Sequence, residues 1–311
     1  MKVFYSPRYE FSLPEHIWPT TKYRLIAEAI RSGGPERSAL QGPAVGRPGL
    51  SGPAIVEPVE ASWEDLTLVH TAEYLDKLRS NTLTAEDIAT LELPWQPALA
   101  DAFRLMVGGT CAAARAAMEE GIAAHLGGGL HHAFANHGEG FCPVNDVAVA
   151  VRVMQRDRGL RRAAIVDCDV HHGNGTSMIF ERDADVFTFS IHQQHNYPFF
   201  KPRSDLDVGL EDEVRDERYL AALGAALPRV MEHRPELVVY LAGADPFEGD
   251  RLGGLKLTKA GLAERDRLVI RACRASGAPL ATVLAGGYAA DVRDTVDIHV
   301  ATIELMAGDT H

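Results

Sequence analysis

Short apolar runs alternate along this chain with longer segments in which apolar residues recur every three or four positions. The runs 237–241 and 280–284 are examples of the short kind. Unbroken apolar runs of this length predict strands buried on both faces, whereas the longer segments predict helices with one apolar stripe. Strand and helix follow one another throughout, which predicts an α/β fold with a mostly parallel central sheet and helices on both faces.

The same pattern places the individual elements. Strands are predicted at 1–5, 122–126, 161–166, 186–192, 237–241 and 280–284. Helices are predicted at 20–32, 63–78, 98–120, 145–158, 218–233 and 258–275. The Pro- and Gly-rich segment 34–58 and the acidic segment 205–215 predict surface loops.

Composition limits the size of the domain, the kinds of binding partner and the cellular compartment that the sequence can indicate. With 311 residues and 46% apolar content, the chain can form one large domain or two smaller ones. A formal net charge of −12 argues against a nucleic-acid-binding surface. The four cysteines are scattered and form no CxxC pair. We expect no signal peptide at the start of the sequence and no membrane span, because the sequence has no apolar run long enough for one. We therefore expect a cytoplasmic protein, whose oligomeric state the sequence leaves open.

Residues that can bind a metal follow the end of the predicted strand 161–166. Asp167, Asp169 and His171 stand at i, i+2 and i+4, so an extended chain directs all three side chains to one face. Asp245 ends another predicted strand. Buried carboxylates need compensating charge, which a divalent metal supplies, and this donor set suits Zn²⁺ or Fe²⁺. Taken alone, the same acids could equally cap the next helix or form ion pairs.

Two further motifs carry acid–base and hydrogen-bonding groups. His131 and His132 follow three glycines, and two imidazoles on such a turn suit general base and general acid work beside a metal-bound water. Tyr288 follows Gly286-Gly287, where its hydroxyl could donate to a developing oxyanion. The plainer alternatives are a structural histidine and a core tyrosine.

The strand-end acids, the histidine pair, the Gly-Gly-Tyr turn and several neighbouring short motifs form blocks of sequence that together resemble the histone deacetylase superfamily. These blocks occur in that family's order. Several details look most like the class IV branch and its bacterial relatives, among them the helix start at Asn145-Asp146 and the loop at 204–209. The blocks that carry the resemblance are Gly129-Leu130-His131-His132-Ala133, Gly140-Phe141-Cys142, Asn145-Asp146, 167–176, Gly243-Ala244-Asp245 and Gly286-Gly287-Tyr288.

The resemblance implies one catalytic domain over residues 1–311 with the arginase/deacetylase fold, built on a sheet of about eight strands. It implies zinc held by Asp169, His171 and Asp245. The implied catalytic set pairs His131 with Asp167, makes His132 the general base and then acid, and gives Tyr288 the carbonyl-polarising role. Asn174 stands where class I members carry an Asp, so the partner of His132 is expected to be neutral.

The resemblance also implies a substrate channel and a second cation. Gly140 would offer its carbonyl to the substrate amide, Phe141 and Tyr197 would form the channel walls, and Leu252 would stand at the rim. Potassium is the expected monovalent cation. Its implied ligands are Asp167, Asp169, His171, Ser190 and Ile191.

The sequence therefore predicts a zinc-dependent amidohydrolase that removes an acetyl or other acyl group from lysine side chains or related amines. The substrate can be an acyl-lysine protein or peptide, an acetylpolyamine or another small amide. Two alternatives remain at this point: a dimanganese ureohydrolase of the same fold, and a non-catalytic acyl-lysine-binding protein.

Overall fold

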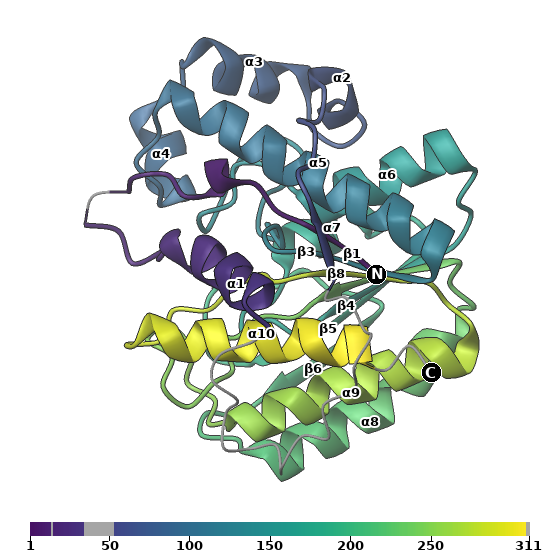
Figure 1. Cartoon of the computed structure of the whole chain (residues 1–311). Coiled ribbons are helices and arrows are strands. Elements are labelled where there is room, and N and C mark those ends of the chain that lie inside the picture. Colours follow the sequence, from purple (N-terminus) through teal and green to yellow (C-terminus); the bar gives the residue numbers. More distant parts are fainter. Residues whose placement is uncertain (14, 34–52, 309–311) are drawn as a thin grey trace.

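The computed structural model describes residues 1–13, 15–33 and 53–308. A sheet of eight strands, all parallel, runs through the molecule in the order β2-β1-β3-β8-β7-β4-β5-β6 (Figure 1). This confirms the predicted parallel α/β architecture. The strands are β1 Lys2–Phe4, β2 Ala54–Val56, β3 Ile122–His125, β4 Ala163–Asp167, β5 Val186–Gln193, β6 Leu206–Leu210, β7 Leu237–Leu241 and β8 Leu280–Val283.

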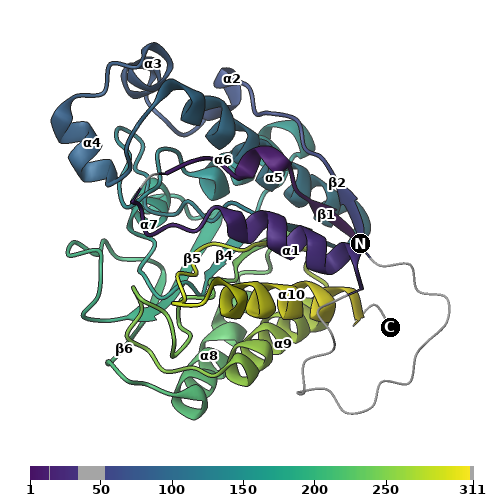
Figure 2. The ribbon, with the colours of Figure 1, turned by 60° about the vertical axis from the view of Figure 1, so that its left-hand side comes forward.

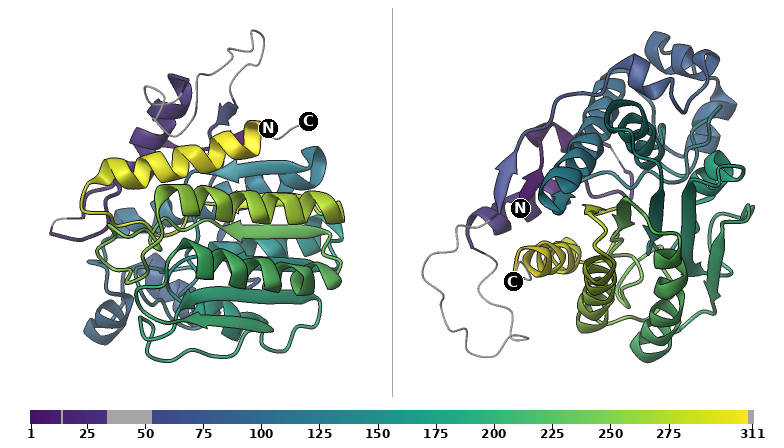
Figure 3. Two further views of the ribbon diagram at one scale, coloured as in Figure 1. Left: turned by 90° about the horizontal axis from the view of Figure 1, so that it is seen from below. Right: turned by 90° about the vertical axis from the view of Figure 1, so that its right-hand side faces the viewer.

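Helices cover both faces of this sheet. On one face α1, α10, α9 and α8 lie side by side in that order, and on the other α5 and α6 pack together with α7 (Figures 2 and 3). No helix in the described part of the chain is long and apolar enough to cross a membrane. The helices are the 3₁₀ turn Pro7–Tyr9 and α1 Thr21–Arg31, α2 Trp63–Leu66, α3 Ala72–Ser80, α4 Ala85–Leu91, α5 Pro97–Glu120, α6 Asp146–Arg158, α7 Asn174–Phe180, α8 Asp216–Glu232, α9 Lys259–Ser276 and α10 Val292–Gly308.

The sequence patterns missed several elements, each for a local reason. The predicted helix 63–78 is two helices, because Thr71 caps α3 by accepting from Tyr74 N. The predicted loop 34–58 contains β2, a three-residue edge strand, and its residues 34–52 lie outside the described part. The acidic loop 205–215 contains the edge strand β6, in which Asp207 and Gly209 weaken the apolar signal. Helices α4 and α10 were not predicted at all.

The sheet order determines which loops meet. Strands β3, β8, β7 and β4 are consecutive neighbours in the middle of the sheet, and all four end at the same edge. In open parallel sheets, ligands bind beyond the carboxyl ends of the strands. The histidine pair follows β3, Asp169 and His171 follow β4, Asp245 follows β7 and Tyr288 follows β8.

Candidate active site

The three predicted metal ligands lie together beyond β4 and β7. Their donor atoms all lie within 4.8 Å of one another. His171 Nδ1 is 3.0 Å from Asp169 Oδ1 and 3.4 Å from Asp245 Oδ2. All three side chains are buried. Main-chain amides hold the carboxylates in place, since Asp169 Oδ2 accepts from Gly286 N at 2.9 Å and Asp245 Oδ1 accepts from Val170 N at 2.9 Å.

This donor set fits a divalent cation. Asp245 Oδ2 is buried and has no hydrogen-bond partner among the described residues. A Cβ on Gly286 would lie 2.0 Å from that oxygen and 2.6 Å from Asp169 Oδ2, so the glycine keeps the space between the carboxylates open. Burial and the neighbouring Asp169 raise the pKa of Asp245 to about 7. Two carboxylates and an imidazole around one open space match the ligands of a catalytic zinc site.

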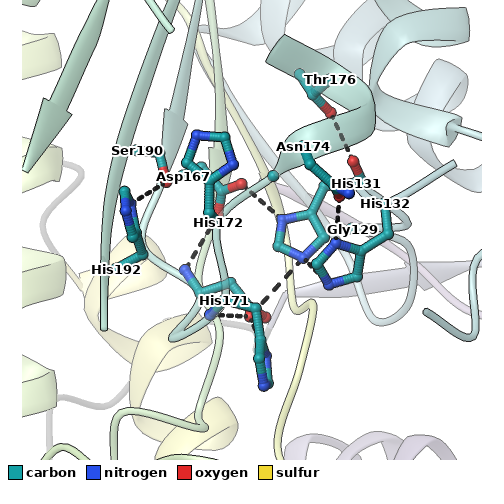
Figure 4. Close-up of polar contacts among 12 residues, drawn as sticks. Gly129, His131, His132, Asp167, His171, His172, Asn174, Thr176, Ser190 and His192 are labelled. Carbon is teal, nitrogen blue, oxygen red and sulfur yellow. Dashed lines mark hydrogen bonds and ion pairs between the residues drawn. The ribbon is translucent and has the colours of Figure 1, made fainter. Parts of the chain in front are cut away.

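The two histidines stand next to each other but have different partners, as Figure 4 shows. His131 Nδ1 donates to Asp167 Oδ2 at 2.6 Å, and His132 Nδ1 lies 2.7 Å from Asn174 Oδ1. Their Nε2 atoms are 3.1 Å apart. Burial lowers the pKa of His131, but Asp167 and Asp169 outweigh this and raise it to about 9. Burial and the two neighbouring imidazoles of His131 and His171 hold the pKa of His132 well below its ordinary value.

The glycine turn that carries the histidines is anchored by α6. Asp146 Oδ2 accepts from Gly129 N at 3.1 Å, and its Oδ1 accepts from Leu130 N at 2.6 Å. Gly128 and Gly129 both have positive φ, and a Cβ on Gly128 would lie 2.3 Å from Asp146 Oδ2. The turn therefore needs glycine both for its backbone conformation and for its close approach to this carboxylate.

Tyr288 lines the same cavity as the two histidines and is held through its backbone. Its N–H donates to Asp250 Oδ2 at 2.6 Å, while Asp250 Oδ1 accepts from Leu252 N at 2.8 Å and Gly253 N at 3.0 Å. Burial, followed by Asp169 and Asp245, raises the pKa of Tyr288 well above its ordinary value. The phenol therefore keeps its proton and can act as a hydrogen-bond donor.

A cavity of about 170 Å³ leads from the surface to these groups. Phe141 and Tyr197 line it, and their rings face the site, with Phe141 6.2 Å from the Tyr288 ring and Tyr197 5.0 Å from the His132 ring. Gly140 and Leu252 line it as well. A Cβ on Gly140 would lie 2.8 Å from His132 Cδ2, so a larger residue there would push into the histidine.

Some of the residues implied for a monovalent cation lie on neighbouring strands. Asp167 pairs with Ser190 in the parallel ladder of β4 and β5, and Ile191 follows. The Asp167 carboxylate already accepts from His131 and from Asp169 N, and Ser190 Oγ lies 3.0 Å from His192 Nδ1. A cation here would therefore depend mainly on main-chain carbonyl oxygens.

Two charged residues of the site were not identified from the sequence. Lys22 of α1 is fully buried; its Nζ donates to Ala285 O at 3.0 Å and lies 5.6 Å from the centre of the Tyr288 ring. Burial lowers the pKa of Lys22 to about 8. Its position four residues before Ile26 on the apolar stripe of the helix was an available signal. The other is Glu139, for which the sequence offers no comparable signal.

Comparison with known proteins gives relatives over the whole chain. Residues 20–303 match the histone deacetylase domain. An uncharacterized protein of Picosynechococcus sp. is 41% identical over 300 residues, which are 96% of this chain and 95% of that protein. Histone deacetylase 2 of Arabidopsis thaliana is 36% identical over 245 residues, which are 76% of this chain and 63% of the plant protein. The crystal structure of the HDA15 HD domain has a TM-score of 0.77 at 25% identity, covering 100% of this chain and 92% of that one.

Proposed function

The chain belongs to the histone deacetylase family, and from this premise we propose that it is a zinc-dependent deacylase. It removes an acetyl or other acyl group from lysine side chains or related amines. The observation that carries the proposal is the convergence of Asp169, His171, His132 and Tyr288 on one cavity, with Asp245 beside the first two. Family membership supports deacetylation as the reaction class, and the donor set supports zinc, with Fe²⁺ as the other metal such ligands accept.

Asp169, His171 and Asp245 would hold the metal. When bound, such an ion lowers the pKa of a coordinated water and polarises a carbonyl oxygen. Only three protein ligands would hold it, and two of them, Asp169 and His171, line the cavity, so a position would remain for water and substrate, as in catalytic rather than structural sites.

His132 would take the proton from the attacking water and then give it to the leaving amine. A general base must be neutral before the attack, and the low pKa of His132 keeps it so. Its Nδ1 faces Asn174 Oδ1, so proton transfer falls to Nε2, which also lies 3.1 Å from His131 Nε2 and would exchange that contact for the reacting water. His131, whose pKa is raised by Asp167 and Asp169, would remain protonated and stabilise negative charge beside the reacting centre.

Tyr288 would donate its hydroxyl hydrogen to the carbonyl oxygen as that oxygen gains charge. Preorganised donors of this kind contribute more in the transition state than in the ground state. Asp250 holds the Tyr288 main chain, and Lys22 holds the carbonyl of Ala285 three residues earlier, so the segment is braced from two sides.

The cavity of about 170 Å³, lined by Phe141 and Tyr197, supports a linear acylated amine as substrate. Phe141 and Tyr197 would flank its methylene chain, the Gly140 carbonyl would accept from its amide N–H, and Leu252 would contact it at the rim. These contacts suit an acyl-lysine peptide and an acylated polyamine alike. A non-catalytic acyl-lysine-binding role is less well supported, because such a protein needs neither the base nor the tyrosine hydroxyl.

Three smaller proposals accompany the function. A potassium ion would sit beside Asp167, Asp169, His171, Ser190 and Ile191. The whole chain, 1–311, would form one catalytic domain, which is supported by a single sheet with strands from residue 2 to residue 283. The protein would act in the reducing cytoplasm, where its four cysteines, all free and buried, would stay as thiols.

A panel of substrates tests the proposed function. Zinc-loaded protein is incubated with acetyl-, longer-chain acyl- and unmodified lysine peptides and with acetylated polyamines, and the released carboxylate is measured. Hydrolysis of at least one acylated amine, with none for a His132→Ala variant that retains its zinc, is the expected result. Absence of hydrolysis across the panel by protein carrying one equivalent of zinc would overturn the proposal.

A further inference from the structure

We propose that Glu139 is a positioning residue that selects the working tautomer of His132 by fixing the orientation of the Asn174 side-chain amide. The inference rests on the proposed function of His132 as the base. It concerns a residue outside the cavity lining and outside the metal ligands.

The contact chain consists of two short hydrogen bonds. Asn174 Nδ2 donates to Glu139 Oε1 at 2.7 Å, and Asn174 Oδ1 lies 2.7 Å from His132 Nδ1. Asn174 is buried, so these two neighbours rather than solvent decide how its amide points. An amide has a donor end and an acceptor end, whereas an ionised carboxylate can only accept. Glu139 therefore attracts the NH₂ end and turns the oxygen of Asn174 toward His132.

The direction of the amide acts together with His131, whose Nε2 lies 3.1 Å from His132 Nε2, on which ring nitrogen of His132 carries the proton. An oxygen facing Nδ1 requires that Nδ1 donate, which leaves the lone pair on Nε2. The reversed amide would offer an N–H to Nδ1 and favour the tautomer protonated at Nε2. That tautomer presents a hydrogen instead of a lone pair to the reacting water, so it cannot act as the base.

Glu139 is itself fixed in place from several sides. Its main chain exchanges hydrogen bonds with Cys142 at 3.1 and 2.9 Å, and its Oε2 lies 3.5 Å from His137 Nε2. Tyr197 Oη donates to the same Oε1 at 3.1 Å. One carboxylate oxygen thus receives both Asn174, which orients the base, and Tyr197, which lines the cavity. Through this shared acceptor, the cavity-lining Tyr197 is connected to Asn174 and so to the base His132.

A double-mutant cycle tests the amide-orientation role. Glu139→Ala should lower kcat roughly 10–100-fold, as expected for loss of a hydrogen bond to a charged group. Glu139→Gln should lose less than Glu139→Ala, because its carbonyl oxygen can still accept from Asn174 and Tyr197, although its own amide no longer excludes the reversed arrangement. Asp at position 174 has two equivalent oxygens and cannot be misoriented. Glu139→Ala combined with Asn174→Asp should therefore turn over faster than Glu139→Ala alone.

The outcomes separate this role from plain structural support. The proposal would be overturned if the fold-changes in kcat of the two single variants simply multiplied in the double variant. It would also be overturned if Glu139→Gln were as impaired as Glu139→Ala. Glu211→Ala is the matched control, since Glu211 also pairs with a histidine, His195 at 3.3 Å, but has no bond to Asn174. It should leave kcat unchanged. Zinc content and thermal unfolding are measured for every variant.

A second readout needs no substrate. In ¹⁵N-histidine-labelled zinc-loaded protein, the ring nitrogens of His132 report its tautomer, and the resonances are assigned by their loss in His132→Gln. Wild type should show Nδ1 protonated, and Glu139→Ala should show a larger share of the Nε2-protonated form. An unchanged tautomer would contradict the positioning role. If this readout responds while no acylated amine is hydrolysed, the positioning holds and the proposed function fails.

Discussion

The floor and the rim of the cavity are built in different ways. On the floor, Asp169, His171 and Asp245 are buried at the ends of central strands, and main-chain amides hold the two carboxylates. Phe199 and Phe200, which we take as the rim, follow the cavity-lining Tyr197 by two and three residues on the loop after β5 and are 105% and 59% exposed.

This difference indicates where chemistry and selectivity reside. A buried carboxylate or imidazole is costly unless a partner compensates it, so the floor tolerates few arrangements and points to one reaction class. Exposed rim side chains have no such constraint and can change without loss of the fold. The reaction follows from the floor, whereas the choice among acylated amines depends on the rim.

Removal of a floor ligand should have the largest effect. Asp245→Ala leaves Asp169 and His171 with an incomplete metal site. Its effect on metal affinity and turnover should exceed the roughly 10–100-fold typical of residues that only support metal ligands. Metal content by elemental analysis and turnover of an acyl-lysine peptide check this. A variant with one equivalent of zinc and full activity would show that Asp245 is not a ligand.

Loss of the tyrosine hydroxyl comes next. Tyr288→Phe keeps the ring in the cavity but removes the donor to the developing oxyanion. We expect kcat to fall roughly 10²–10³-fold with little change in KM, because the hydrogen bond strengthens mainly in the transition state. Tyr74→Phe, which removes a buried hydroxyl bonded to Pro143 O away from the cavity, is the matched control. Equal losses in both variants would rule out a catalytic role for Tyr288.

Placing a negative charge next to His132 Nδ1, by Asn174→Asp, should change turnover less than the two substitutions above, and the change should depend on pH. Activity requires neutral His132, so it falls as pH drops through the pKa of that residue, which lies below its ordinary value. In Asn174→Asp, a carboxylate favours the imidazolium form and raises this pKa. The acidic limb of the plot of turnover against pH should therefore move to higher pH. Each pH unit of that shift corresponds to about 1.4 kcal/mol of added preference for the protonated form of His132.

Asn136→Asp is the control for this shift. Asn136 also contacts a histidine Nδ1, that of His137 at 2.9 Å, but it is exposed and not bonded to His132. Its acidic limb should stay close to that of wild type. A limb in Asn174→Asp that stays in place or moves to lower pH would contradict the tuning role of residue 174. The direction is the test, because the limb reports the coupled histidine pair.

Changes at the rim should have the smallest effects and should depend on the substrate. Phe199→Ser removes a fully exposed ring, so thermal unfolding should not change. KM for a long acyl-lysine peptide should rise by less than about fivefold, as for most peripheral interface residues, while a small acylated amine is unaffected. Val59→Ser, at an exposed residue that does not line the cavity, should change neither value. Equal effects on both substrates would show that the rim does not distinguish them.

The floor could be predicted from the sequence because its chemistry is local. The positions of Asp169, His171 and Asp245 just beyond strand ends are visible in short patterns, and parallel strands bring such ends together. The extended-chain argument for one common face did not hold, because β4 ends at Asp167 and the chain bends at 169–171. Edge strand β2 was missed because it has only three residues, and β6 because Asp207 and Gly209 interrupt its apolar residues. Helix α10 was missed although eight of its residues are buried, because Thr295, His299 and Thr302 are among them and interrupt its apolar stripe.

The supporting charges could not be predicted in the same way. Asp250 and Glu139 act through bonds to Tyr288 N and to Asn174 Nδ2, which depend on how loops far apart in sequence meet. Neither residue lies on a periodic stripe whose pattern would reveal it. Lys22 is different, because its place on the buried stripe of α1 was visible, but its partner Ala285 O is 263 residues away.

The central claim is that the floor forms a metal-dependent site for hydrolysis of acylated amines. The most direct test measures release of carboxylate and free amine from an acyl-lysine peptide by purified protein, before chelation, after chelation, and after addition of one equivalent of Zn²⁺. We predict hydrolysis that disappears on chelation and returns with the metal. Hydrolysis that continues in fully metal-free protein, or none in protein shown to hold one equivalent of zinc at Asp169, His171 and Asp245, would contradict the claim.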